Sequence, residues 1–298
     1  PHPATGGLTV VSQPENSNPQ DPPTTDHEWD GIREFNNPLP RWWLWTLYAC
    51  IAWAVAYWIA MPSWPLISDY TRGVLGYSQR LTLADEMKAA QAAQSVYRSR
   101  ISANSLEAIR TDPALLEFAI AGGRSAFAVN CSQCHGGGAA GFPGYPNLND
   151  DAWLWGGTVT AIHQTIRYGI RSGHPDARSA AMPAFLKDEV LTATQIDDVA
   201  EYVLTLSNQK SNKAAARRSA KIFAEQCAPC HRKTGKGNAE FGAPDLTDAI
   251  WLYGGDKAII YQTIAYSRNG VMPSWETRLD PVTLKQLAIF VHSLGGGN

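Results

Sequence analysis

The sequence predicts a mainly α-helical protein, with one N-terminal transmembrane helix followed by two tandem copies of a small helical domain. Three observations carry this prediction. Residues 42–60 form a run without charged side chains, a five-residue cysteine motif occurs twice, and the segments around the two motifs resemble each other. Self-similarity over a whole functional unit indicates two copies of one domain.

The N-terminal segment, residues 1–40, is rich in Pro, Asn, Thr and acidic side chains and has no hydrophobic period. Such a composition buries too little apolar surface to offset the entropy of ordering the chain. We therefore expect this segment to be partly disordered, and largely so until Asp30.

The uncharged run 42–60 would span roughly 28 Å at about 1.5 Å per residue, close to the ~30 Å hydrocarbon core of a bilayer. Arg41 precedes it, Pro62 and Pro65 end it, and tryptophans gather near both ends, as in interfacial belts. A cleaved signal peptide would have to begin after 41 polar residues and lacks a small-residue cleavage site. We predict a permanent single-pass anchor within residues 41–66.

Residues 67–120 connect this anchor to the first repeat. Between Leu81 and Leu116 the apolar side chains recur at helical spacing, and the segment starts rich in Ala and Gln. We expect a helical linker here rather than a free chain.

The motif Cys-x-x-Cys-His occurs at residues 131–135 and again at 227–231. It is the attachment sequence for c-type haem, in which two thiols form thioether bonds to one porphyrin and the histidine faces the iron. A thioredoxin-type pair would not need the histidine, and a zinc site would place its other ligands closer. The motifs predict two covalently bound haem c groups, attached through Cys131, Cys134, Cys227 and Cys230, with His135 and His231 as axial ligands.

Two of the four methionines fall at matching places after these motifs. Met182 follows His135 by 47 residues and Met272 follows His231 by 41, each with proline next. A thioether is a soft ligand that favours reduced iron. We expect Met182 to complete the first haem with His135, and Met272 the second with His231.

Two histidines near Met182 are alternative ligands. His163 or His174 could replace the methionine and give bis-histidine ligation, but the second copy has Tyr261 where the first has His163. The repeat therefore favours a solvated helix or loop histidine at both positions.

Each copy resembles a class I cytochrome c, and we place the domains at residues 121–210 and 211–298. A helix leads into each motif, and helices 195–206 and 284–294 close the two copies. In that family the first and last helices cross at a small residue, for which Gly123 and Ser219 are the candidates. The resemblance also implies that the carbonyls of Pro146 and Pro244 fix the two haem-binding imidazoles. Trp153 and Trp251 occupy matching places, for which packing near the haems and plain core packing are equal alternatives.

The net charge of −2 is unevenly distributed between the copies. Residues 121–207 have five Lys/Arg and eight Asp/Glu, a charge of −3, whereas residues 213–298 have eleven and seven, a charge of +4. Opposite fields could orient a redox partner, and a solvated surface without such a role is an equal alternative. Nothing in the sequence indicates nucleic-acid binding.

The segment from Asp30 to Trp43, Asp-Gly-Ile-Arg-Glu-Phe-Asn-Asn-Pro-Leu-Pro-Arg-Trp-Trp, is similar to the one that precedes the membrane helix in the dihaem CcoP (FixP) subunit of cbb₃-type cytochrome c oxidase. From Asp30 to the C-terminus the order of parts agrees with that family. The resemblance implies a subunit without its own catalytic centre. It would accept electrons from a periplasmic cytochrome c or the bc₁ complex, and pass them through the monohaem subunit to the oxygen-reducing, proton-pumping haem–copper subunit.

Covalent haem attachment takes place outside the bacterial cytoplasmic membrane. We therefore expect the haem domains on the periplasmic side of the inner membrane and the N-terminus in the cytoplasm. Three alternatives stay open at this point: a membrane-bound carrier of another respiratory enzyme, a dihaem peroxidase, and a haem-based gas sensor.

Overall fold

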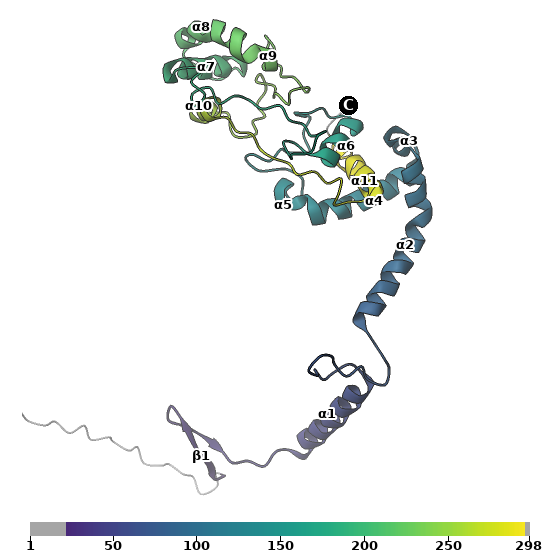
Figure 1. Cartoon of the computed structure of the whole chain (residues 1–298). Helices are drawn as coiled ribbons and strands as arrows, with labels where there is room; N and C mark the ends of the chain where they lie inside the picture. The colour runs from purple at the N-terminus through teal and green to yellow at the C-terminus, as the bar shows by residue number, and fades with distance from the viewer. Residues whose placement is uncertain (1–21, 296–298) are drawn as a thin grey trace, which may run out of the picture. The chain divides into compact units, whose positions relative to one another are not determined.

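The computed structural model describes residues 22–295, and the predicted disorder of residues 1–21 lies outside this range. The chain forms two compact units, which meet within one helix, and each is described by itself (Figure 1).

The first unit begins with a β-hairpin, in place of the disorder predicted up to Asp30. Strand β1 (Thr24–Trp29) pairs antiparallel with β2 (Ile32–Phe35). Asp30 and Gly31 connect them with φ angles of 48° and 82°. A two-residue turn with positive φ at both positions matches the twist of paired strands and favours Asp-Gly. The dipeptide was the available signal, and the prediction of disorder was wrong for this part.

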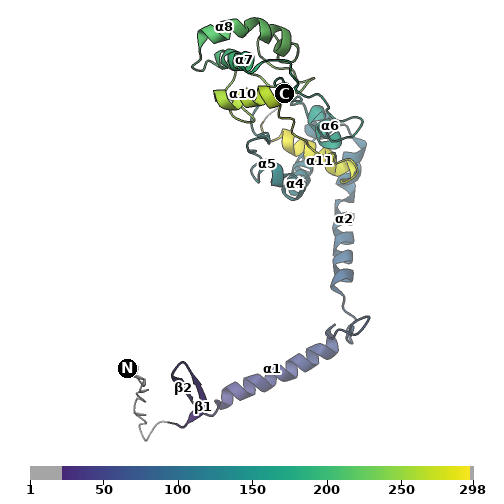
Figure 2. The same ribbon diagram turned by 60° about the vertical axis from the view of Figure 1, so that its left-hand side comes forward.

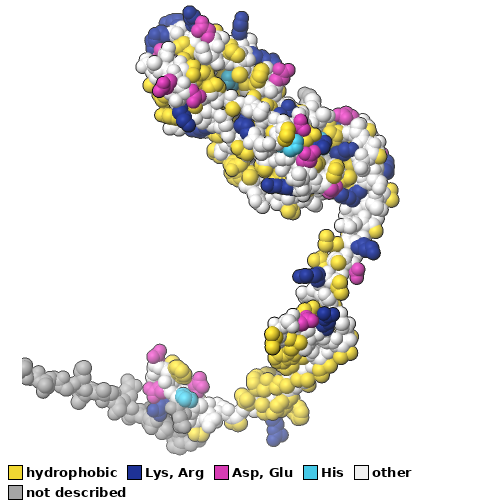
Figure 3. Space-filling view, viewed as in Figure 1, with side chains coloured by type: hydrophobic (Ala, Val, Ile, Leu, Met, Phe, Trp, Pro, Cys, Tyr) yellow, Lys and Arg dark blue, Asp and Glu magenta, His cyan; other side chains and the backbone are white. Residues whose placement is uncertain are grey.

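Helix α1 (Arg41–Ala60) follows the hairpin and confirms the predicted apolar helix. It is the described helix long and apolar enough to cross a membrane, with a mean hydropathy of 1.4, and none of its residues is buried. Hydrophobic side chains cover the face of α1 that Figure 3 shows. Helix α2 (Gln79–Ala103) confirms the helical linker and continues into the second unit.

The second unit is helical, and most of its helices begin at a capping side chain. Asp112 accepts from two backbone amides at the start of α4, with proline at the first helical position, and Asp280 does the same for α11. Because α4 starts at Pro113, the linker ends before residue 120. The helices are α3 (Leu106–Thr111), α4 (Pro113–Asn130), α5 (Ser132–His135), α6 (Val159–Tyr168), α7 (Ala193–Leu206), α8 (Lys213–Ile222), a π-helical turn η1 (Phe223–Cys227), α9 (Ala228–His231), α10 (Lys257–Tyr266) and α11 (Pro281–His292).

Two apolar cores divide this unit, and each draws on both copies of the repeat. In the first core, α4 and α6 pack with the C-terminal α11, and the rings of Phe127 and Phe290 lie 5.5 Å apart. In the second core, α7 packs with α8 and α10, and the rings of Tyr202 and Phe223 lie 4.6 Å apart. Figure 2 shows α11 beside α4, away from the group of α7, α8 and α10.

The predicted packing partners are therefore exchanged. Helix α7, expected to close the first copy, covers the second, and α11 closes the first. We call residues 90–178 with 271–295 the first lobe, and residues 179–270 the second lobe. The predicted crossing residues are present, but with the other partner: Gly123 lies against Gln286 and Phe290 of α11, and Ser219 donates to the carbonyl of Asp198 in α7 at 2.7 Å.

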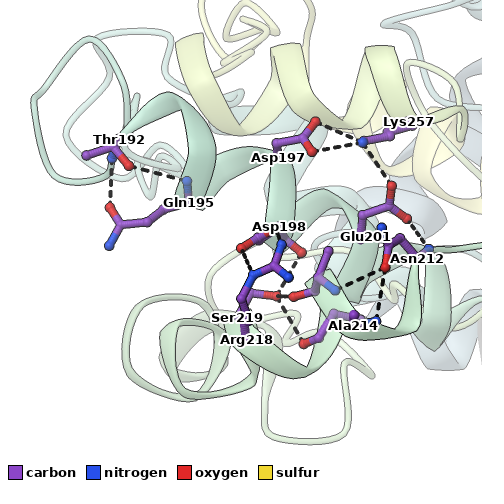
Figure 4. A network of polar contacts seen from close by, with 12 residues as sticks. Thr192, Gln195, Asp197, Asp198, Glu201, Asn212, Ala214, Arg218, Ser219 and Lys257 are labelled. Carbon is purple, nitrogen blue, oxygen red and sulfur yellow. Dashed lines mark hydrogen bonds and ion pairs between the residues drawn. The ribbon is translucent and has the colours of Figure 1, made fainter.

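Polar contacts hold the exchanged helix α7 in the second lobe (Figure 4). Lys257 of α10 forms ion pairs with Asp197 and Glu201 of α7, both at 2.8 Å. The other carboxylate oxygen of Glu201 accepts from the backbone of Asn212, the residue that caps α8. Contacts with Lys257 hold the pKa of Glu201 below its usual value. The network therefore joins three helices around a half-buried charge cluster.

The exchange removes the predicted charge asymmetry. Counted by lobe, the first has nine Lys/Arg and eight Asp/Glu, and the second has eleven and ten. Each lobe thus has a formal charge of +1, so opposite fields do not distinguish them.

Candidate haem sites

The first cysteine motif lies where α4 ends and α5 begins. Nδ1 of His135 lies 3.2 Å from the carbonyl oxygen of Pro146, as the sequence predicts. Because a carbonyl only accepts, Nδ1 carries the proton and Nε2 keeps the lone pair that iron requires. Burial lowers the pKa of His135, against the opposing effect of this hydrogen bond. The imidazole is therefore neutral at pH 7, as a metal ligand must be.

The second motif has the same histidine geometry, although a π-helical turn precedes it in place of an α-helix. The π-helical turn η1 leads into Cys227, and Nδ1 of His231 lies 3.1 Å from the carbonyl oxygen of Pro244. Burial also lowers the pKa of His231. The same tautomer follows, with Nε2 free for a ligand bond.

The first thiol of each motif is half-buried. Burial raises the pKa of Cys131 to about 11, with a smaller contribution from Cys134. The pKa of Cys227 is raised to about 11 by the same cause, with a contribution from Cys230. At this raised pKa both thiols are protonated at neutral pH.

The methionines lie in the lobes opposite to those predicted. Met272 lines an apolar cavity with Phe127, Cys131 and His135, closed by Leu287 and Val291 of α11. Met182 packs on the second core, which contains Phe223 and Cys227. The structure therefore brings Met272 to the motif of His135 and Met182 to the core beside Cys227, which differs from the predicted pairing of each histidine with the methionine that follows it. The segment that precedes each of the exchanged helices, and carries its methionine, lies in the same lobe as that helix.

Hydrogen bonds fix both methionine segments, between backbone groups at Met272 and from side chains at Met182. Met272 and Ile170, which follows α6, exchange two backbone hydrogen bonds of 2.9 and 3.0 Å. In the second lobe the carbonyl of Met182 accepts from the hydroxyl of Ser267 at 2.7 Å and from the amide of Asn269 at 3.3 Å. Each methionine is thus anchored to the segment that follows α6 or α10, the middle helix of its own lobe.

The residues fit the haem groups that the motifs predict. One cavity of about 1380 Å³ is lined by both motifs and both methionines, whereas pockets for one small ligand typically have about 300–1,000 Å³. Trp153 lines this cavity, and its buried Nε1–H has no acceptor within residues 22–295. Buried donors are rarely left unpaired, and a haem propionate would supply the acceptor.

Neither alternative histidine belongs to this cavity. His163 lies on α6 and does not line either methionine site. Nε2 of His174 lies 2.9 Å from a carboxylate oxygen of Glu276, and its Nδ1 accepts from the backbone of Asp176 at 3.0 Å. Neither imidazole lines a methionine site, and the hydrogen bonds of His174 differ from the solvated state that the repeat favours.

The two lobes meet through a reciprocal aromatic contact. Trp155 packs on Gly242, in the loop that carries Pro244, and Tyr253 packs on Gly144, in the loop that carries Pro146, at 3.2 Å from where a Cβ would stand. Each glycine has positive φ, so only glycine combines this turn with this approach. The loop that holds one histidine therefore touches the aromatic side chain of the other lobe.

Sequence reasoning missed the side chains that surround the methionine segments. Nε of Arg167 donates to a carboxylate oxygen of Glu276 at 2.8 Å. Glu276 stands four residues after Met272 in the sequence. Arg171 donates to backbone carbonyls in both methionine segments. The signal was a longer segment before the first methionine, because Met182 follows His163 by 19 residues whereas Met272 follows the matching Tyr261 by 11.

These observations define a class of protein: a c-type cytochrome with tandem domains and an apolar helix for membrane anchoring. Residues 21–68 match the family described as the N-terminal domain of cytochrome oxidase-cbb3, FixP. Residues 118–203 and 214–291 match the one described as cytochrome c oxidase, cbb3-type, subunit III.

Similar proteins from three bacteria agree along most of the chain. The cbb3-type cytochrome c oxidase subunit FixP of Azorhizobium caulinodans is 52% identical over 93% of this chain and 94% of its own length. Subunit CcoP of Cereibacter sphaeroides is 49% identical over 96% and 99%. FixP of Bradyrhizobium diazoefficiens is 52% identical over 92% and 95%. The chain belongs to this family, the membrane-anchored electron-transfer cytochrome subunits of cbb3-type oxidases.

Proposed function

We propose that the chain holds two covalent haem c groups whose axial ligands come from both copies of the repeat. Cys131 and Cys134 hold the first haem, with His135 and Met272 on its iron. Cys227 and Cys230 hold the second, with His231 and Met182. The observation that carries this proposal is the position of Met272 in the cavity of His135, closed by α11.

The side chains around each site suit electron transfer. A c-type haem supplies a one-electron couple when it is bound. The Pro146 carbonyl keeps the proton of His135 on Nδ1, and the core of Phe127 and Phe290 excludes water. A methionine in the sixth position stabilises the reduced iron and leaves no position for substrate. Two such sites relay electrons and do not themselves activate oxygen or peroxide.

The ligand pairing can be tested one haem at a time. Changing both Cys227 and Cys230 to alanine leaves only the first haem, whose ferric methionine charge-transfer band can then be recorded. Adding Met272→Ala should abolish this band, and adding Met182→Ala should leave it. The opposite result would restore the pairing of each histidine with the methionine that follows it in the sequence.

We further propose the direction and place of the electron transfer. Electrons enter from a periplasmic cytochrome c or the bc₁ complex, and leave through the monohaem subunit to the oxygen-reducing, proton-pumping haem–copper subunit. Helix α1 crosses the inner membrane once, the lobes lie in the periplasm, and the N-terminus lies in the cytoplasm. The family membership and the apolar surface of α1 support this arrangement.

Purification from native membranes tests this assignment. A tag on the chain should isolate, in mild detergent, a complex that consumes oxygen with reduced cytochrome c and contains high-spin b-type haem. A chain that elutes from intact membranes with neither property is a carrier outside the oxidase, and peroxide turnover by that chain would indicate a peroxidase.

A further inference from the structure

Arg171 lies directly after the residue that pairs with Met272. Its φ of 50° is in the left-handed region, which bulky side chains adopt only where surrounding contacts hold them. Nη1 donates to the carbonyl of Ala180 at 2.7 Å, and Nε donates to the carbonyl of Gly270 at 2.8 Å. Ala180 and Gly270 each stand two residues before a methionine, so one guanidinium holds both methionine segments.

The charge of Arg171 has no carboxylate partner. Among residues 22–295 no Asp or Glu lies within ion-pair distance of it, although several other arginines of the lobes form such pairs. Its side chain lines the cavity shared by the two motifs. Burial lowers its pKa, but an arginine stays charged in proteins. Arg171 therefore adds a positive charge to the lining of this space, which also includes Arg232, Lys236 and Arg268.

The second copy of the repeat has no arginine at the position that matches Arg171. Asn269 stands in the second copy where Arg171 stands in the first, 98 residues earlier. Its amide is neutral and contacts only one methionine segment, at the backbone of Met182. The pseudo-symmetry of the lobes is thus broken at this position, where Arg171 bonds both methionine segments and Asn269 bonds one.

We propose that Arg171 is a positioning residue common to both haem sites, which fixes the two methionine segments against each other and raises the reduction potentials of both haems. The inference rests on the proposed ligand pairing. A cation beside an iron favours the reduced state, which carries one positive charge less. A guanidinium fork that bonds two carbonyls cannot release one segment without loosening the other.

Two substitutions separate the charge from the hydrogen bonds. Arg171→Gln removes the charge and cannot reach both carbonyls. Arg171→Lys keeps the charge but not the fork. The measurements are made on the haem-loaded full chain in detergent: reduction potentials by spectroelectrochemical titration, and the affinity of each ferric haem for imidazole, which displaces the methionine.

Arg171→Gln should lower both reduction potentials, and both haems should bind imidazole more tightly, on the order of tenfold. Tenfold corresponds to about 1.4 kcal/mol, within the range for a hydrogen bond to a charged group. Arg171→Lys should keep both potentials near those of the parent protein while imidazole affinity rises. Glu276→Leu is the matched control, because Glu276 contacts the first lobe only and should change the first haem alone.

A change confined to the first haem in Arg171→Gln, or no change in either haem, would overturn the inference. Haem content and circular dichroism equal to the parent show that a variant has folded, and if Arg171→Gln does not fold, Arg171→Lys still tests the rise in imidazole affinity at both haems. The variants with a single haem, described above, keep this result separate from the proposed pairing. If Met272→Ala abolishes the band of the first haem but Arg171→Gln leaves both haems unchanged, the pairing stands and the inference fails.

Discussion

The exchange of helices can be tested at Gly123, where α4 crosses α11. A Cβ on Gly123 would meet the backbone carbonyl of Gln286 and would lie 2.5 Å from Cβ of Phe290. Neither atom can move without shifting α11. At the neighbouring Gly122, a Cβ would meet only the end of the Gln286 side chain, which can change rotamer. Gly122→Ala is therefore a control with the same chemistry in the same helix.

The expected difference follows from two opposing effects. Alanine in a helix is more stable than glycine by about 1 kcal/mol, and this gain applies to both variants. Overpacking against fixed neighbours costs about 1–3 kcal/mol, and it applies to Gly123→Ala. The free energy of unfolding of the first lobe should thus be about 1–3 kcal/mol lower in Gly123→Ala than in Gly122→Ala.

The assay is urea unfolding of the haem-loaded chain, followed through the methionine charge-transfer band of the first haem. Since Met272 lies in the segment that leads directly into α11, wedging α4 away from α11 should release this methionine at a lower urea concentration. Equal stability of the two variants, or a loss of the Met182 signal in place of the Met272 signal, would refute the packing of α11 on α4.

Two further predictions concern charges that hold the lobes. Glu276→Leu should loosen Met272 alone. Bonds from Arg167 hold the pKa of Glu276 below its usual value of 4.5, so the stabilisation of Met272 by Glu276 is complete above about pH 4.5 and is lost as the pH falls below it. A pH series of the charge-transfer band would show this loss. Lys257→Met leaves two carboxylates of α7 without their partner and should lower the free energy of unfolding of the second lobe by about 1–2 kcal/mol in urea. Lys221→Met, which breaks an exposed ion pair, should change it little. Equal effects of these two variants would contradict the network.

Much of each site could be predicted from sequence, because its chemistry is local. The cysteine motifs follow from the spacing of neighbouring residues, whereas the Pro146 carbonyl and the small residue at Gly123 are implied by the resemblance to class I cytochromes c. A repeat shows which segments resemble each other, but not which copy a segment packs on. Since both copies present matching aromatic faces, Phe127 can accept Phe290 as well as a residue of α7.

The short loop between α7 and α8 nevertheless indicated in the sequence that these two helices pack together. Only residues 207–212 join α7 to α8, and consecutive helices with such a short loop usually pack side by side. The alternative would have returned α7 to α4, more than 60 residues earlier. Arg171 could not have been found in this way, because its role depends on two carbonyls brought together by the exchange.

The interleaved lobes set an order for biosynthesis. A chain grows from its N-terminus, so the first attachment motif is complete long before Met272 and α11 have been made. During this interval the first lobe lacks one wall, while the second lobe, residues 179–270, can be finished as an uninterrupted stretch. The lobe that begins first therefore matures last, and a nascent chain cut short anywhere before α11 leaves an open haem crevice that proteases and quality-control factors can recognise.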